Sequence, residues 1–330
     1  MGIAAMNDTM KALQIAAPGR VEWSNVPTPK PGLGEVGLRV EQVNTCPHWD
    51  LHLMDGVPMF TGGTIEYPYT LAQPGHEAVG QVVEVGPDVE DLSVGQRVAC
   101  WRDAGHHRQG CYAQYVCMSA QDVLPLPDDV TWDQATSLEL AMCVQVSFEQ
   151  LLRNGAVENA QFGVGGLGPA GLVAVQMAKA YGASEIVGID PLGARRDMAL
   201  RLGADATVAP DDDWPADRHG KHGLDAAIDC TGLKASIEFL MDRTRRAVAI
   251  FGVLREEVAY GSRHWAGLSL IGYEPHHRAA AEAALGLVAD GKLDLAALIT
   301  EKLPLSQYEE GTEKLRRKEA VKICYLPWEA

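Results

Sequence analysis

A glycine-rich turn near the middle of the chain occurs in a context that few folds accommodate. The turn reads Gly166-Leu167-Gly168-Pro169-Ala170-Gly171; it follows the strand-like run Phe162 to Gly165 and precedes the helix-like run Leu172 to Tyr181. In such units the first glycine permits a tight turn, the second lets backbone approach a ligand, and the third lets helix and strand pack closely. Free N–H groups at the start of the helix favour an anion. The turn therefore predicts a parallel α/β sheet with a diphosphate-binding site.

Asp190 indicates that the bound diphosphate belongs to a dinucleotide. It follows the next apolar run, Glu185 to Ile189, and lies 24 residues after Gly166. A carboxylate at this distance accepts hydrogen bonds from the adenosine ribose hydroxyls, where a 2′-phosphate would be repelled. Arg195, a little further on, is the residue that could instead accept such a phosphate. We expect NAD as the cofactor, with Asp190 and Arg195 in its site.

Strands and helices alternate from Gly155 onward. Further strands are expected at residues 225–229, 247–251 and 268–271. This alternation predicts a doubly wound parallel sheet. Because ligands of such sheets bind at the carboxyl ends of the strands, the expected cofactor site also includes Cys230 and Gly252, which directly follow two of these runs.

The two ends of the chain have other patterns. From Lys11 to Ala120, short apolar runs alternate with turn residues, which predicts a mainly-β domain. One helix is expected from Thr131 to Leu152, because Thr131 can cap its start. The tail from Pro275 is expected to be mainly helical before the apolar run Val321 to Leu326.

Charge and composition limit the classes of partner. The chain has 44 acidic and 28 basic residues, for a formal net charge of −16. This balance argues against nucleic acid and anionic membranes as partners. No apolar run is long enough to span a bilayer, and the first residues lack the pattern of a secretory signal. The seven cysteines include no Cys-x-x-Cys pair, so we expect free thiols and a cytoplasmic protein.

Five segments are characteristic in combination: Pro29 to Val36, Pro74 to Gly80, Val94 to Val98, Gly110 to Val116 and Gly166 to Leu172. Together they resemble the medium-chain dehydrogenase/reductase family, especially its zinc-dependent alcohol and polyol dehydrogenases, over nearly the whole chain. The resemblance implies a GroES-like mainly-β catalytic domain, residues 1–135 completed by 275–330. It also implies a Rossmann dinucleotide-binding domain, residues 136–274, with the active site between the two.

The resemblance further implies one catalytic zinc. Its ligands would be Cys46, His76 and Glu77, with Glu139 close enough to exchange with water. Cysteine, histidine and carboxylate suit zinc, and an open fourth position is typical of a catalytic rather than a structural site. Only Cys100 and Cys111 stand where the family's structural zinc lobe has four cysteines, so we expect no structural zinc.

The segment around the first ligand departs from the family pattern. It reads Cys46-Pro47-His48-Trp49-Asp50-Leu51-His52, with one residue more than the family's Cys-Gly-Ser/Thr-Asp-x-His. Alignment on Asp50 places Pro47 at the ligand position, whereas alignment on Cys46 places His48 where the family has a proton-relaying hydroxyl. We expect Cys46 to be the ligand and His48 or Asp50 to carry the proton from the substrate toward solvent. His52 is the alternative proton relay. The competing outcomes are His48 as a ligand and a site without metal.

These features predict an NAD-dependent dehydrogenase acting on a secondary alcohol or polyol. One alternative is a zinc-free quinone or enoyl reductase of the same fold; the other is a non-catalytic cofactor-sensing protein. We expect a homodimer or homotetramer, because the strand at 268–271 would otherwise be a bare apolar sheet edge.

Overall fold

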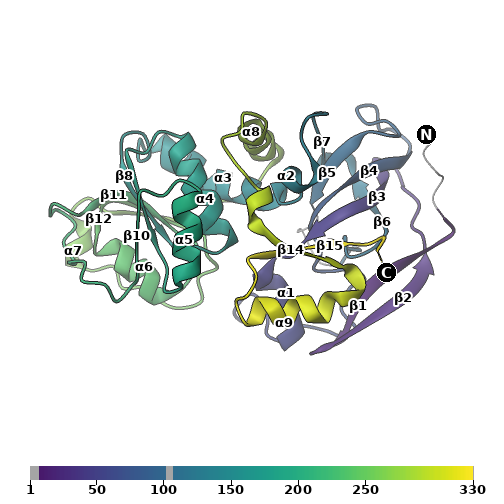
Figure 1. Ribbon diagram of the computed structural model, residues 1–330, viewed down its shortest axis with the longest axis horizontal. Coiled ribbons are helices and arrows are strands. Elements are labelled where there is room, and N and C mark those ends of the chain that lie inside the picture. Colours follow the sequence, from purple (N-terminus) through teal and green to yellow (C-terminus); the bar gives the residue numbers. More distant parts are fainter. Residues whose placement is uncertain (1–6, 102–106, 330) are drawn as a thin grey trace. The chain divides into compact units, whose positions relative to one another are not determined.

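The computed structural model describes residues 7–101 and 107–329. The chain forms two compact units, residues 1–139 with 295–330 and residues 140–294 (Figure 1). Among the described residues, no helix has the length and apolar character needed to cross a membrane.

The chain passes from the first unit to the second after Glu139 and returns to the first after Asp294. Helix α8 (Arg278–Ala289) belongs to the second unit. Its capping residue His277 lies 3.2 Å from the Glu149 carboxylate, and the Gln176 side chain bonds both backbone groups of Asp294. These contacts keep residues 275–294 with the sheet of the second unit, so the first unit is completed only from Leu295.

The first unit is mainly β, as the sequence predicts. Its seven-stranded sheet has the order β14-β15-β3-β4-β5-β7, with β6 pairing on β3, and β1 and β2 form a separate antiparallel pair. Its elements are β1 (Thr9–Ala17), β2 (Arg20–Pro27), β3 (Glu35–Asn44), α1 (Pro47–Asp55), β4 (Glu77–Val85), β5 (Arg97–Trp101), β6 (Tyr115–Ser119), β7 (Val123–Pro125), α2 (Trp132–Ala135), β14 (Ile299–Pro304), α9 (Tyr308–Arg316) and β15 (Lys322–Leu326), with short 3-10 turns at Ala120–Asp122, Ala296–Leu298 and Leu305–Gln307.

The second unit contains the predicted parallel sheet. Its strand order is β10-β9-β8-β11-β12-β13, so the direction of winding reverses between β8 and β11. Its elements are β8 (Gln161–Gly165), α4 (Pro169–Ala180), β9 (Glu185–Ile189), α5 (Gly193–Arg201), β10 (Ala206–Val208), β11 (Leu224–Asp229), α6 (Lys234–Met241), β12 (Thr244–Ile250), α7 (Ser262–Trp265), β13 (Ser269–Ile271) and α8, and α3 (Leu138–Arg153) leads into it from the first unit.

Two sequence-based element predictions were wrong in detail. The helix expected from Thr131 to Leu152 is two helices, α2 and α3, because a turn at Thr136 and Ser137 interrupts it. Thr131 does form a capping box with Gln134. The tail contains a strand, β14, in addition to helices. Its alternating exposed and half-buried residues give little apolar signal, and it forms by pairing in parallel with β15.

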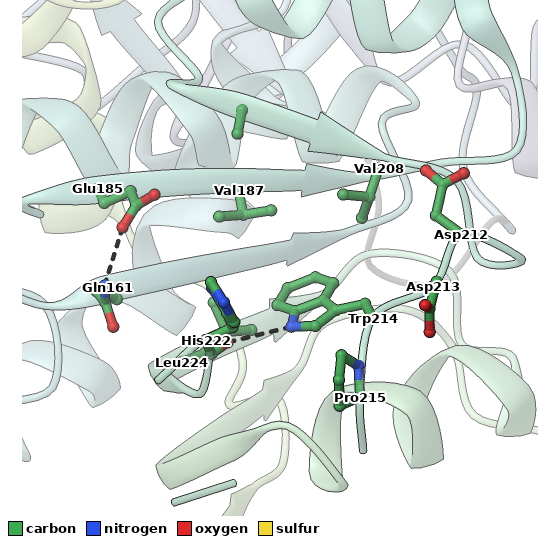
Figure 2. Close-up of a pocket in the computed structure, with 11 residues that line it drawn as sticks. Gln161, Glu185, Val187, Val208, Asp212, Asp213, Trp214, Pro215, His222 and Leu224 are labelled. Carbon is green, nitrogen blue, oxygen red and sulfur yellow. Dashed lines mark hydrogen bonds between the residues drawn. The ribbon is translucent and has the colours of Figure 1, made fainter. Parts of the chain in front are cut away.

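The crossover from β10 to β11 contains no helix, although the structure describes all of residues 209–223. A loop replaces it, and Arg218 anchors that loop by donating to the backbone carbonyls of Thr244, Arg245 and Arg263. The indole of Trp214 lies against the sheet beside a shallow hollow of about 310 Å³ (Figure 2). None of the predicted site residues lines this hollow.

Asp50 links helix α1 to helix α9 and to the segment before β6 in the interior of the first unit. It lies on α1 with no solvent exposure. One carboxylate oxygen accepts hydrogen bonds from the Tyr112 hydroxyl at 2.8 Å and from the Tyr308 hydroxyl at 2.7 Å. The Tyr325 ring packs against both tyrosines. Burial raises the pKa of Asp50 to about 7, although both hydroxyls favour the charged form.

The raised pKa predicts a specific pH dependence of stability. A carboxyl whose folded-state pKa lies above its unfolded-state value stabilises the fold most at low pH and loses that contribution as pH rises. The stability of wild type relative to Asp50→Asn should therefore fall between about pH 4 and pH 7, by about 1.4 kcal/mol per pH unit. Urea unfolding of both proteins across this range measures the difference. The exposed Asp128→Asn variant is the control, and parallel curves for wild type and Asp50→Asn would contradict the expectation.

Candidate functional site

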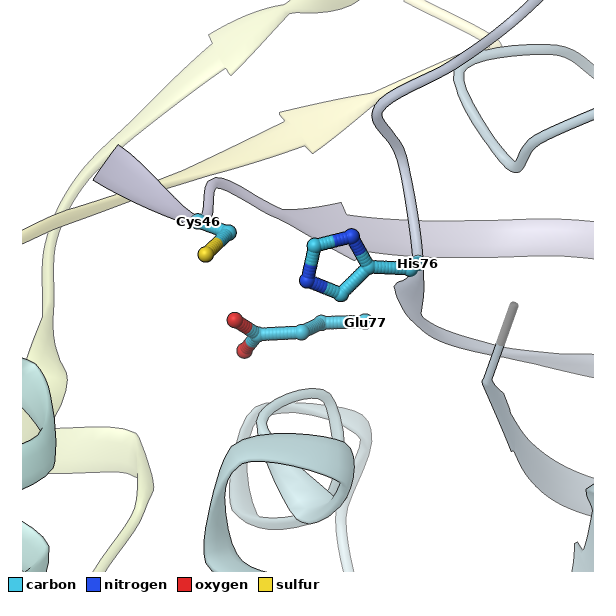
Figure 3. A group of neighbouring side chains, drawn as sticks. All are labelled: Cys46, His76 and Glu77. Carbon is cyan, nitrogen blue, oxygen red and sulfur yellow. The ribbon is translucent and has the colours of Figure 1, made fainter. Parts of the chain in front are cut away.

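Three potential metal donors converge in the first unit. Cys46 is the residue before α1, while His76 and Glu77 lie where the chain enters β4. The thiol, one imidazole nitrogen and one carboxylate oxygen all lie within 4.8 Å of one another (Figure 3). His76 and Glu77 are buried, and Cys46 is partly so. The extra residue after Cys46 does not remove the thiol from this group.

Glu139 lies beside the same group. It is in the first turn of α3 and is buried. Its carboxylate oxygen lies 3.8 Å from His76 Nε2. The four residues expected around zinc are therefore neighbours, although they come from three separate parts of the sequence.

Sequence reasoning missed Lys322, which is fully buried at the start of β15. Its ammonium donates to both carboxylate oxygens of Glu77, at 2.5 and 2.6 Å, and to the backbone carbonyl of Thr45 at 2.6 Å. The available signal was a single lysine within the apolar run Val321 to Leu326. An isolated buried charge is too costly to persist unless a partner compensates it.

Burial dominates the electrostatics of the donors. It raises the pKa of the Glu77 carboxyl, while the Lys322 charge opposes that rise. It also raises the pKa of the Cys46 thiol well above its usual range, and the Glu77 charge adds to the increase. A divalent cation would favour the deprotonated form of both groups. The donor chemistry and its spacing therefore fit zinc with three protein ligands.

The residues expected to carry the proton lie on α1, in different environments. His48 is exposed, and its ring centroid lies 5.1 Å from that of His52. Nδ1 of His52 lies 2.9 Å from the backbone oxygen of Val57. Asp50 is instead enclosed by tyrosines, as described above. This burial does not suit the expected role of Asp50 as a proton carrier toward solvent, and the two histidines are better placed for it.

The glycine-rich turn between β8 and α4 has the expected geometry. Gly166 has a φ of +82°, which favours glycine. A Cβ at Gly171 would lie 1.8 Å from the carbonyl oxygen of Gly166, so close packing requires glycine there. By contrast, a Cβ built at Gly168 meets no heavy atom within 4 Å. The space beside Gly168 at the start of α4 is therefore open, as a diphosphate requires.

Asp190 is oriented by the same turn. One carboxylate oxygen accepts from the Leu167 N–H and the other from the Leu192 N–H, both at 2.8 Å. Arg195 is half-buried and interacts electrostatically with Asp190. Arg196, which the sequence did not single out, donates to the backbone carbonyl of Asp190. The acidic side chain is thus fixed at the carboxyl end of β9.

The loops after β11 and β12 pack against each other at the carboxyl edge of the sheet. A Cβ at Gly252 would lie 2.0 Å from the Gly232 nitrogen, so Gly252 is required for this packing. Cys230 is half-buried directly after β11. Asp229 holds its loop by accepting from the Thr231 and Gly232 N–H groups. The predicted cofactor residues therefore lie in loops and in the first turns of α4 and α5 at the carboxyl edge of this sheet.

Both units match family models. Residues 32–128 match the alcohol dehydrogenase GroES-like domain, and residues 169–269 match the zinc-binding dehydrogenase domain. The L-threonine 3-dehydrogenase of Pyrococcus horikoshii is 27% identical, with 97% of this chain and 99% of that protein covered. The alcohol dehydrogenase of Geobacillus stearothermophilus is 29% identical, with 96% of each covered.

A solved structure supports the fold. The 2R,3R-butanediol dehydrogenase of Bacillus subtilis superposes with a TM-score of 0.84 at 24% identity, covering 96% of this chain and 99% of that one. Two domain matches in the expected order, similarity along nearly the full length and the grouped metal donors agree with one another. The chain belongs to the zinc-type medium-chain dehydrogenase/reductase family.

Proposed function

We propose that this protein is an NAD-dependent dehydrogenase that transfers hydride between a secondary alcohol or polyol and the nicotinamide, with one catalytic zinc. The observation that carries the proposal is the convergence of Cys46, His76 and Glu77 within 4.8 Å. The relatives are alcohol and threonine dehydrogenases, which favours alcohol oxidation over the quinone reductase and the sensor alternatives.

Different residues of the first unit would bind the metal and transfer the proton. Cys46, His76 and Glu77 would hold zinc, and Glu139 would lie next to the open position. Bound zinc supplies a Lewis acid that lowers the pKa of an alcohol. His48 and His52, on the exposed side of α1, would pass the released proton toward solvent, since imidazole exchanges protons near neutral pH.

Removal of a metal donor should remove both metal and activity. We expect about one zinc per chain in wild type and far less in Cys46→Ala and His76→Ala, because each loses one of three protein ligands. Elemental analysis after mild purification measures this, and alcohol-dependent NADH formation should fall at least about 100-fold. Cys117→Ala, a half-buried thiol on β6, is the control. Full activity of metal-free wild type would contradict the zinc proposal; metal loss in His76→Ala alone would favour His48 as a ligand.

Cofactor choice should depend on Asp190. We expect tighter binding of NADH than of NADPH, because the Asp190 carboxylate would repel a 2′-phosphate. Asp190→Ala should narrow the difference by about tenfold, and fluorescence titration with both reduced cofactors measures it. Asp190 also accepts hydrogen bonds from the Leu167 and Leu192 N–H groups. Asp190→Asn is therefore a second variant, which removes the charge and keeps one side-chain oxygen as an acceptor. Tighter binding of NADPH by wild type would overturn the assignment.

We further propose a cytoplasmic homodimer or homotetramer that pairs through β13. This strand ends the parallel sheet and pairs only with β12 among the described strands. Trp265, just before it, is 79% exposed, which is unusual for so large an apolar side chain. The seven free cysteines suit a reducing compartment.

Light scattering at micromolar concentration should give the mass of at least two chains. Trp265→Asp should shift the protein toward smaller species, because a charge would then be buried at the pairing edge. Leu33→Asp alters another exposed apolar residue, in the first unit, and should leave the mass unchanged. A monomeric mass for wild type would refute this assembly.

A further inference from the structure

The position of Lys322 is unusual for a lysine. Its side chain is fully buried, and its ammonium contacts both oxygens of Glu77. It also donates to the carbonyl of Thr45, the residue before Cys46. Lysine is among the residues least often buried, and burial requires a compensating charge or hydrogen bonds. Lys322 thus contacts one expected metal ligand directly and the backbone beside another.

The contact between Lys322 and Glu77 lies among several groups that can carry negative charge. The expected donors include one thiol and one carboxylate, and the Glu139 carboxylate lies near His76. Without a cation these groups would be strongly destabilised in their charged forms by burial. Lys322 supplies one positive charge at the Glu77 carboxylate. A divalent ion at the donors would supply two more, and would approach the same carboxylate that Lys322 already contacts.

We propose that Lys322 is the resident counter-ion of the metal centre: it keeps Glu77 in place when no metal is bound, and it competes with the metal for that carboxylate. The inference rests on the proposed zinc centre. Lys322 is therefore a positioning residue, acting through Glu77. Its presence lets the first unit remain folded without metal, at the expense of weaker metal binding.

Electrostatics predicts how the loss of Lys322 changes the affinity for the metal. In the metal-free protein, replacing Lys322 with a neutral residue leaves Glu77 buried without its partner, which destabilises that state. In the metal-bound protein the same change removes a positive charge that repels the ion, and it releases a carboxylate oxygen to the metal. Both effects increase the free-energy difference between the metal-free and metal-bound states. Loss of Lys322 should therefore tighten metal binding.

The test uses Lys322→Met, which has a similar length and no charge, and Lys322→Gln, which retains hydrogen-bonding groups if the methionine variant does not fold. Zinc affinity is measured by competition with a chromogenic chelator, and Tm is measured with and without zinc. The control is Lys302→Met on β14, because Lys302 forms a more exposed ion pair with Asp133.

We expect both Lys322 variants to bind zinc at least about tenfold more tightly than wild type. Loss of a partner of a metal ligand usually weakens metal binding by about 10- to 100-fold; here the sign is reversed, because the partner removed is a cation that competes with the metal. The Tm of both variants should also rise more on zinc addition than that of wild type or of Lys302→Met. A purely structural lysine would lower Tm equally with and without zinc.

Two outcomes would overturn the inference, and they differ in what else they affect. If wild type binds zinc while the Lys322 variants bind it equally or more weakly, the counter-ion role is wrong and the zinc centre stands. If wild type itself binds no zinc, the zinc centre and the counter-ion role both fail.

Discussion

The junction of the C-terminal strand with the end of β3 holds the segment that carries the metal donor Cys46. Thr45 donates its N–H to the carbonyl of Ile323, and its hydroxyl accepts the Ile323 N–H. Lys322, the neighbouring residue, joins Thr45 to Glu77. Cys46 directly follows this junction. The pairing of β3 with β4 places Asn44 opposite Glu77, and the C-terminal strand adds Lys322 between Thr45 and Glu77, so residues from distant parts of the chain hold the thiol and the carboxylate near each other.

Local sequence signals predicted the parts of the structure that depend on local geometry. The glycine-rich turn and the position of Asp190 at the end of β9 follow from backbone requirements that few residues satisfy. The β9 strand agrees with its predicted range because an apolar run and flanking turn residues define both ends. Strand β14 was missed because its stability comes from pairing with β15, and that pairing is not encoded in its own apolar pattern.

The candidate metal site could also be predicted from the sequence only in part. Cys46, His76 and Glu77 could be named from the resemblance, although their proximity could not be derived from spacing. The burial of Asp50 could not be predicted, because its environment is made by Tyr112 and Tyr308, which are 62 and 258 residues away in sequence. Lys322 could not be linked to Glu77, 245 residues away, because no local pattern indicates the partner of a buried charge.

The loop between β10 and β11 has a consequence for how this fold can vary. It leaves the carboxyl end of β10, where Asp190 donates its N–H to the Val208 carbonyl, and it enters the amino end of β11 at Leu224, away from the glycine-rich turn. Its order depends on a few long side chains such as Arg218 and not on helical hydrogen bonds. The chain can therefore change length near the Leu224 end of this loop without moving Asp190 or the glycine-rich turn, which makes that end a suitable point for insertions during divergence or engineering.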